Sequence, residues 1–173
     1  LVAGKGMAGG YAPITGVYAT AEISDVIADG GLSVMFHTYA ALPQSCAAAA
    51  MVLTILREEE LLDRVRRIGP QLKAQFEERF SQHPLVAEIR GHGMLLGIEI
   101  VKDRKTLECF PEEQHIAERL VGHAVEKGVF FYPGGTGEVR DILCIGAPFI
   151  IGEPEIDMMA DALGYALDKI LAE

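Results

Sequence analysis

The spacing of apolar and polar residues predicts five helices along the chain. The clearest covers residues 59–81, where apolar side chains recur at intervals of three and four and the remaining positions are charged. Gly69-Pro70 interrupts this pattern and predicts a kink. The other predicted helices cover residues 21–29 (after Thr20 as N-cap), 43–53, 112–127 and a final stretch that opens at Glu153.

Short apolar runs bounded by glycine and proline predict strands. Residues 85–90 and 94–101 are expected to form a hairpin around Gly91-His92-Gly93. Helices on one face of a small, mostly antiparallel sheet would make the second half an α+β lobe. The other predicted segments are a buried strand at 1–3, a strand at 14–20, an extended or looped stretch at 32–42, a buried strand at 129–132, a loop at 133–137 and a strand at 142–145.

Composition limits the class of protein. Half of the 173 residues are apolar and the formal charge is −10, which argues against nucleic acid or an anionic membrane as the main partner. No apolar run approaches the roughly 18 residues of a membrane span, and no export signal opens the chain. Three unpatterned cysteines (Cys46, Cys109 and Cys144) indicate reduced thiols and a cytoplasmic protein. Because the first residue already lies in an apolar segment, the chain is expected to be a piece of a longer polypeptide.

The first candidate for chemistry is Lys5, which lies between Gly4 and Gly6 directly after an apolar triplet. Burial would disfavour the charged form of this amine, and a neutral amine can form a Schiff base with a carbonyl. The alternative is a lysine in a glycine-rich surface loop. The segment also contains the dinucleotide-binding spacing Gly-x-Gly-x-x-Gly, but Pro13 and a run of strand composition follow it, so no helix is predicted to hold a pyrophosphate there.

Five segments in matching order resemble the class III aminotransferases, which are pyridoxal-phosphate enzymes. They are the Lys5 segment, His37-Thr38-Tyr39, the stretch from His83 to Glu99, Tyr132-Pro133-Gly134-Gly135, and Ala147-Pro148-Phe149-Ile150-Ile151. Each segment alone is a weak signal, but together they cover essentially the whole chain. One departure is Ala147-Pro148, where the family often has two prolines.

The resemblance implies roles for three residues. Lys5 corresponds to the lysine that holds pyridoxal 5'-phosphate as an imine and then moves a proton between substrate and cofactor. Thr38 corresponds to a threonine that donates to the cofactor phosphate of the neighbouring subunit, which implies a homodimer; the alternative is a loop hydroxyl that caps its own backbone. Arg140 is a candidate for binding a substrate carboxylate, with a surface ion pair to Asp141 as the alternative. For His37, Tyr11 and Tyr132, packing is the expected role; the alternatives are that His37 faces the cofactor and that the two tyrosines line the entry to the pocket.

The resemblance also implies the fold: an α/β, pyridoxal-phosphate-dependent transferase of fold type I. Residues 1–58 would be the C-terminal end of the large cofactor-binding domain, 59–82 a connecting helix, and 83–173 the small α+β C-terminal domain. In this family the phosphate cradle, the ring-stacking aromatic residue and the aspartate at the pyridine nitrogen precede the lysine. The isolated chain is therefore expected to be inactive and to expose an apolar face where the missing lobe belongs.

The function implied is transamination between an amine or amino acid and a keto acid or aldehyde. Two alternatives stay open: an aminomutase or racemase on the same scaffold, and a truncated, non-catalytic dimerising module. The sequence does not indicate which amino donor or acceptor is used.

Overall fold

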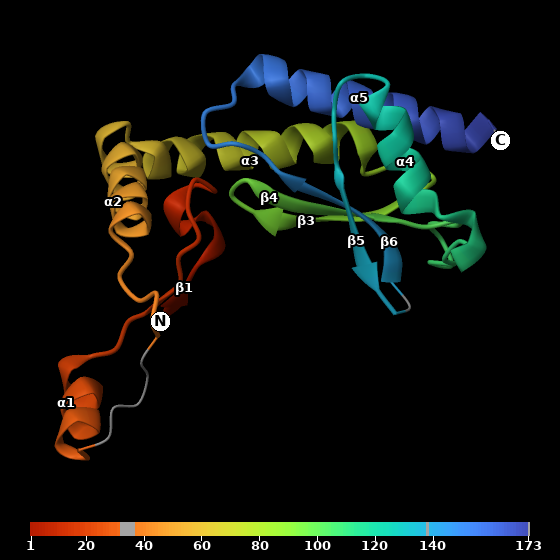
Figure 1. The fold of residues 1–173 in the computed structure, drawn as a ribbon. Coiled ribbons are helices and arrows are strands. Elements are labelled where there is room, and N and C mark those ends of the chain that lie inside the picture. Colours follow the sequence, from red (N-terminus) through yellow and green to blue (C-terminus); the bar gives the residue numbers. More distant parts are fainter. Residues whose placement is uncertain (32–36, 138, 173) are drawn as a thin grey trace. The chain divides into compact units, whose positions relative to one another are not determined.

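A computed structural model describes residues 1–31, 37–137 and 139–172 of the chain. These fall into two units, Leu1–Leu61 and Leu62–Glu173, and each has its own internal structure (Figure 1). The stretch 32–36, which the sequence assigned to an extended or looped segment, lies outside the described residues.

The first unit contains two short strands and two helices. Strand β1 (Val2–Ala3) pairs antiparallel with β2 (Gly16–Val17), and a 3-10 turn, η1 (Lys5–Ala8), lies between them. The predicted strand at 14–20 is therefore shorter than expected. Helices α1 (Ala21–Asp29) and α2 (Pro43–Glu58) begin where the sequence predicted, although the Thr20 side chain makes no capping hydrogen bond.

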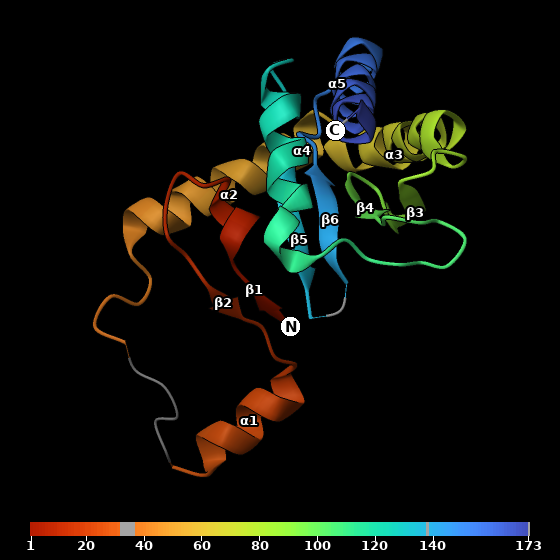
Figure 2. The ribbon, with the colours of Figure 1, turned by 90° about the vertical axis from the view of Figure 1, so that its right-hand side faces the viewer.

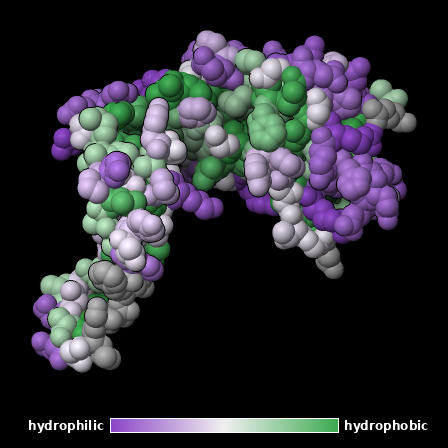
Figure 3. Space-filling view, in the orientation of Figure 1, coloured by the Kyte–Doolittle hydropathy of each residue, from purple (hydrophilic) through white to green (hydrophobic). Residues whose placement is uncertain are grey.

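The first unit leaves most of its large apolar side chains in solvent. Its buried apolar residues, within the described part of the chain, are Ala8, Ala49 and Leu61. Leu1 is 86% exposed and Val2 is 70% exposed, so the prediction of a buried first strand is wrong for this chain. Figure 3 shows apolar residues mixed with polar ones on the surface of this unit, so exposed apolar surface of the kind expected from the sequence is present here. It also includes Tyr11, Val17, Val26, Tyr39, Met51 and Leu53.

The second unit is a four-stranded antiparallel sheet with three helices. Its strands are β3 (Val86–His92), β4 (Leu95–Ile100), β5 (Tyr132–Thr136) and β6 (Val139–Gly146), in the order β3-β4-β6-β5. The helices are α3 (Leu61–Phe80), α4 (Ile116–Val125) and α5 (Glu153–Ala172), which Figure 2 shows from a second direction. The predicted hairpin and the α+β arrangement are confirmed.

One face of the sheet and the apolar faces of the helices form the core. In β4 the even-numbered residues Leu96, Ile98 and Ile100 are buried, as strand periodicity requires. Helix α3 contributes Leu72 and Phe76 to the same cluster, and α4 and α5 complete it. Helix α3 is thus part of the second unit's core.

Helix α3 continues through Gly69-Pro70 without a break, where the sequence predicted a distortion. A Cβ atom on Gly69 would lie 2.8 Å from both the Cα and the carbonyl oxygen of Gly93 in the β3–β4 turn. Gly69 therefore allows the helix backbone to approach the hairpin closely. The close packing of the helix against this turn therefore explains why residue 69 is a glycine, which the periodicity of the helix did not predict.

Two predicted elements have different bounds in the structure. The segment 129–132 is not a strand, and pairing with β6 starts only at Tyr132, so the predicted loop 133–137 contains most of β5. The helix predicted at 112–127 is divided, because His115 has a left-handed φ of 47° between η2 (Glu112–Gln114) and α4. A left-handed residue cannot continue a right-handed helix.

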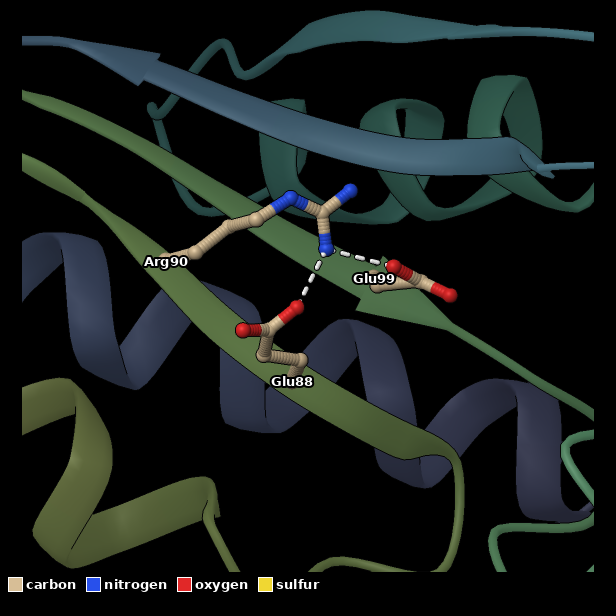
Figure 4. A network of polar contacts seen from close by, with 3 residues as sticks. All are labelled: Glu88, Arg90 and Glu99. Carbon is tan, nitrogen blue, oxygen red and sulfur yellow. Dashed lines mark hydrogen bonds and ion pairs between the residues drawn. The ribbon is translucent and has the colours of Figure 1, made fainter.

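An ion-pair network lies on β3 and β4. Arg90 donates to Glu88 over 2.9 Å and also to Glu99 across the hairpin (Figure 4). The hydrogen bond to Glu99 is the main cause that raises the pKa of Arg90 above its usual value. The network joins the two strands of the hairpin on positions that alternate with the buried residues.

We predict that Gly69→Ala lowers the free energy of unfolding. The new methyl group would meet backbone atoms that cannot move aside, and overpacking of this kind costs about 1–3 kcal/mol. Gly122→Ala in α4 is the matched control, since its Cβ would meet no atom within 4 Å; it should stabilise the helix by up to about 1 kcal/mol. Urea unfolding of both variants measures the difference, and equal effects would contradict the close-approach explanation.

We also predict that acid destabilises the chain through His83. Burial lowers the pKa of this imidazole below 6.5, partly offset by Asp168, and its Nδ1 accepts a hydrogen bond from the Leu85 N–H over 3.2 Å. The unfolded state then binds more protons than the folded state, so stability must fall as the pH decreases through about 6.5. Between about pH 7.5 and 5.5, His83→Gln should lose less unfolding free energy than the parent chain. Parallel pH dependences would show that His83 is not responsible.

Candidate functional site

Lys5 is held at an unusual backbone conformation. It is the first residue of η1 and has a left-handed φ of 49°, which is uncommon for a residue other than glycine. The turn packs against α2: Ala8 is completely buried, and a Cβ on Gly9 would lie 3.1 Å from Cγ2 of Val52 in that helix. Strained positions cluster at functional sites, so the backbone favours a functional role for Lys5.

The side chain of Lys5 is exposed, so the desolvated surroundings predicted from the sequence are not present. Gly4 and Gly6 flank it, and a Cβ on Gly6 would meet no atom within 4 Å. The amine is therefore open to approach by another molecule.

Thr38 lies in a tight turn just before α2. The Ala40 N–H donates to the His37 carbonyl over 2.9 Å, and Ala41 has a left-handed φ of 51°. Thr38 is exposed, and the structure records no hydrogen bond between it and Lys5 within the described residues. The two residues predicted to hold the cofactor are thus both accessible, but no recorded hydrogen bond connects them within the described part of this chain.

A cavity of about 390 Å³ lies beside this turn, within the first unit. Thr15, His37, Tyr39 and Ser45 give it polar walls, and Ser45 is buried. A Cβ on Gly4, the residue before Lys5, would lie 3.3 Å from Oγ1 of Thr15, which lines the cavity. The sequence did not assign Ser45 to a site, and it favoured a packing role for His37. The only sequence signal that His37 lies at this cavity is its position beside Thr38.

The first turn of α2 borders the same cavity and has no side-chain cap. Pro43 is at its start, and the first intrahelical bond runs from the Cys46 N–H to the Leu42 carbonyl over 3.0 Å. The N–H groups of Gln44 and Ser45 have no helical partner. Free N–H groups at a helix N-terminus attract anions, and Ser45 and Cys46 of this turn line the cavity.

Arg140 lies in the second unit, beside a separate cavity of about 410 Å³. Its Nη1 donates to the Gly137 carbonyl over 2.9 Å and lies 4.0 Å from Oε2 of Glu112. Asp141 instead accepts from the Ala117 N–H over 3.3 Å at the start of α4, and burial raises the pKa of its carboxyl. The recorded ion pair of Arg140 is with Glu112, and the charge of Arg140 also acts to lower the pKa of the neighbouring Asp141 carboxyl, against the larger effect of burial.

Arg64 is a polar residue that the sequence did not single out. From the first turn of α3 its guanidinium donates to three consecutive carbonyls, those of Phe149 (3.0 Å), Ile150 (3.0 Å) and Ile151 (2.6 Å). These contacts hold the loop between β6 and α5. No sequence pattern links residues that lie more than eighty positions apart.

Several other features bear on the site. Tyr11 and Tyr132 are 89% and 66% exposed, so their predicted packing role is wrong for this chain. Within the part of the chain that the structure describes, none of the three cysteines forms a disulfide. Within residues 1–31, 37–137 and 139–172, no three metal-binding side chains come together, and no helix combines the length and apolar character of a membrane span.

Comparison with known proteins points to one family. Residues 1–167 match the family model described as Aminotransferase class-III. The chain is 38% identical over 172 residues to the uncharacterized aminotransferase C1771.03c of Schizosaccharomyces pombe, covering 97% of this chain and 38% of that protein.

Solved structures agree with the sequence match. One comes from work on directed evolution of transaminases by ancestral reconstruction; it has a TM-score of 0.92 at 30% identity and covers 99% of this chain and 38% of its own. A PLP-bound aminotransferase mutant from Vibrio fluvialis has a TM-score of 0.88 at 26% identity, with 99% and 37% covered. The chain thus spans less than two fifths of these proteins.

We predict that Arg64→Gln loosens the β6–α5 loop. Hydrogen bonds from a charged donor contribute about 1.5–3 kcal/mol each at most, and exposure of two of them reduces this value. The expected loss is about 1–2 kcal/mol of unfolding free energy, with faster hydrogen exchange at residues 147–152. Arg57→Gln, whose recorded partner is an exposed Glu58, should change neither quantity; unchanged exchange in Arg64→Gln would refute the role.

Proposed function

Because the chain belongs to the class III aminotransferase family, we propose that it forms part of an enzyme that moves an amino group between an amine or amino acid and a keto acid or aldehyde. The observation that carries this proposal is Lys5. Its accessible amine lies between two glycines at a left-handed backbone position, in a turn fixed to α2.

The residues present fit part of a pyridoxal 5'-phosphate site. Lys5 would hold the cofactor through its amine, and the Thr38 hydroxyl with the uncapped turn of α2 would bind a phosphate. When bound, the cofactor supplies an electron sink that stabilises negative charge on the substrate carbon. Lys5 would then act as the base, since Nζ can accept a proton at the substrate and return it.

The proposal includes a homodimer in which Thr38 serves the cofactor of the neighbouring subunit. Two features support it. Thr38 and Lys5 are both exposed and are not joined within one chain, and the first unit exposes apolar side chains of a size that proteins normally cover. Residues from both subunits would then be needed to complete each site.

Arg140 is proposed to bind a carboxylate of the substrate. Its planar fork suits that group, and it borders an open cavity. Its present partners, the Gly137 carbonyl and a carboxylate 4.0 Å away, are weak enough to be exchanged for a substrate.

We predict that Lys5→Ala abolishes both transamination and covalent cofactor retention in the full-length protein. Loss of an acid-base group alone costs about 10²–10⁴ in rate, and loss of the covalent link should also remove the visible absorption that persists after gel filtration. Lys105→Ala, an exposed lysine far along the chain, is the control. Retained absorption in Lys5→Ala would show that Lys5 does not hold the cofactor, and failure to consume a keto acid acceptor in the parent protein would contradict transamination.

A further inference from the structure

A groove in the second unit lies apart from both regions described above. It runs where α3 passes the β3–β4 turn and has a volume of about 320 Å³. Its floor is apolar, because Leu96 is almost fully buried and Val65 packs against the core. The groove is lined by Val65, Arg66, Gly69, Pro70, Lys73, Gly91, His92, Gly93 and Leu96.

Glycines keep this groove open. Gly91 and Gly93 have φ angles of 142° and 60°, which side-chain-bearing residues rarely adopt. Gly69 lies against Gly93, so the wall between helix and hairpin is made of backbone. A bound segment can therefore reach the backbone without displacing side chains.

The charge of the lining is unusual for this chain. The protein carries a formal charge of −10, yet the lining contains Arg66, Lys73 and His92 and no aspartate or glutamate. Arg66 pairs with Asp63 and Lys73 with Glu77, but both pairs are exposed and their carboxylates are not part of the lining. Surface pairs of this kind are weak, so an incoming carboxylate can replace them.

The groove also offers backbone hydrogen-bonding groups. Strand β3 is the outermost strand of the sheet on that side, within the described residues, and Gly91 and His92 at its end are exposed. Unpaired edges of this kind accept an added strand. On the other wall, Pro70 has no N–H, so the Arg66 carbonyl does not receive its usual helical hydrogen bond.

We propose that this groove binds an extended acidic peptide segment of a partner protein. The segment would add to the edge of β3, insert an apolar side chain over Leu96 and Val65, and place carboxylates two residues to either side near Arg66 and Lys73. Residues two apart lie on the same face of a strand, so one face of the peptide supplies all three contacts. The proposal does not depend on the transaminase function.

The probe is the blocked pentapeptide Glu-Thr-Ile-Thr-Glu, titrated into the full-length protein that contains this chain and followed by amide chemical shifts. Saturable binding with shifts centred on Gly91, His92 and Gly93 is expected, together with weakening at higher salt. The matched peptide Lys-Thr-Ile-Thr-Lys should bind roughly tenfold more weakly, because its charges oppose Arg66 and Lys73.

Matched variants locate the site. The double variant Arg66→Gln/Lys73→Gln should weaken the acidic peptide roughly three- to tenfold. The control Arg104→Gln/Lys105→Gln removes the same two charges at a distant loop and should leave binding unchanged. Equal affinity for both peptides, equal loss in both variants, or no saturation at millimolar peptide would overturn the proposal. Self-association of the chain that Arg66→Gln/Lys73→Gln abolishes would also overturn it, since the occupant would then be a second copy.

Discussion

The contact between Gly69 and Gly93 determines how the second unit is assembled. With no side chain at either position, α3 lies against the β3–β4 turn at backbone distance. That approach brings Leu72 and Phe76, which follow along the helix, onto the buried face of the sheet. The same approach forms the wall of the groove beside the hairpin. Core and groove thus depend on the same two glycines.

The two units differ in how far they can account for their own stability. The second buries a continuous cluster from three helices and four strands, which is what a domain needs to hold together. Among its described residues, the first buries three apolar ones (Ala8, Ala49 and Leu61) and leaves larger ones such as Tyr11, Val26 and Leu53 in water. Hydrophobic burial is the main favourable contribution to folding, so the first unit's structure requires apolar surface from elsewhere to cover it.

The sequence predicted the helices and the hairpin because their periodicity is local. It failed at Val129–Tyr132, where Val129 and Phe131 are buried and Phe130 and Tyr132 are exposed. The alternation was real, but strand pairing begins only at Tyr132, and side-chain burial does not determine which backbone groups pair. The left-handed His115 that divides the predicted helix and the clamp from Arg64 to Phe149 also have no local sequence signal. At the site, the glycines beside Lys5 correctly indicated an accessible amine. The apolar triplet before it wrongly suggested a buried one.

The exposure of Lys5 has a consequence for catalysis. A lysine that acts as nucleophile and base must lose its proton readily, and proteins achieve this by removing water or by placing charges nearby. Around Lys5 the described residues leave the side chain open, because β1 is exposed and Gly6 faces open space. The first unit therefore supplies the position of the amine in the proposed site, through the left-handed backbone of Lys5 and the packing of its turn against α2. This explains why the sequence around the lysine is informative about chemistry even though its side chain is exposed.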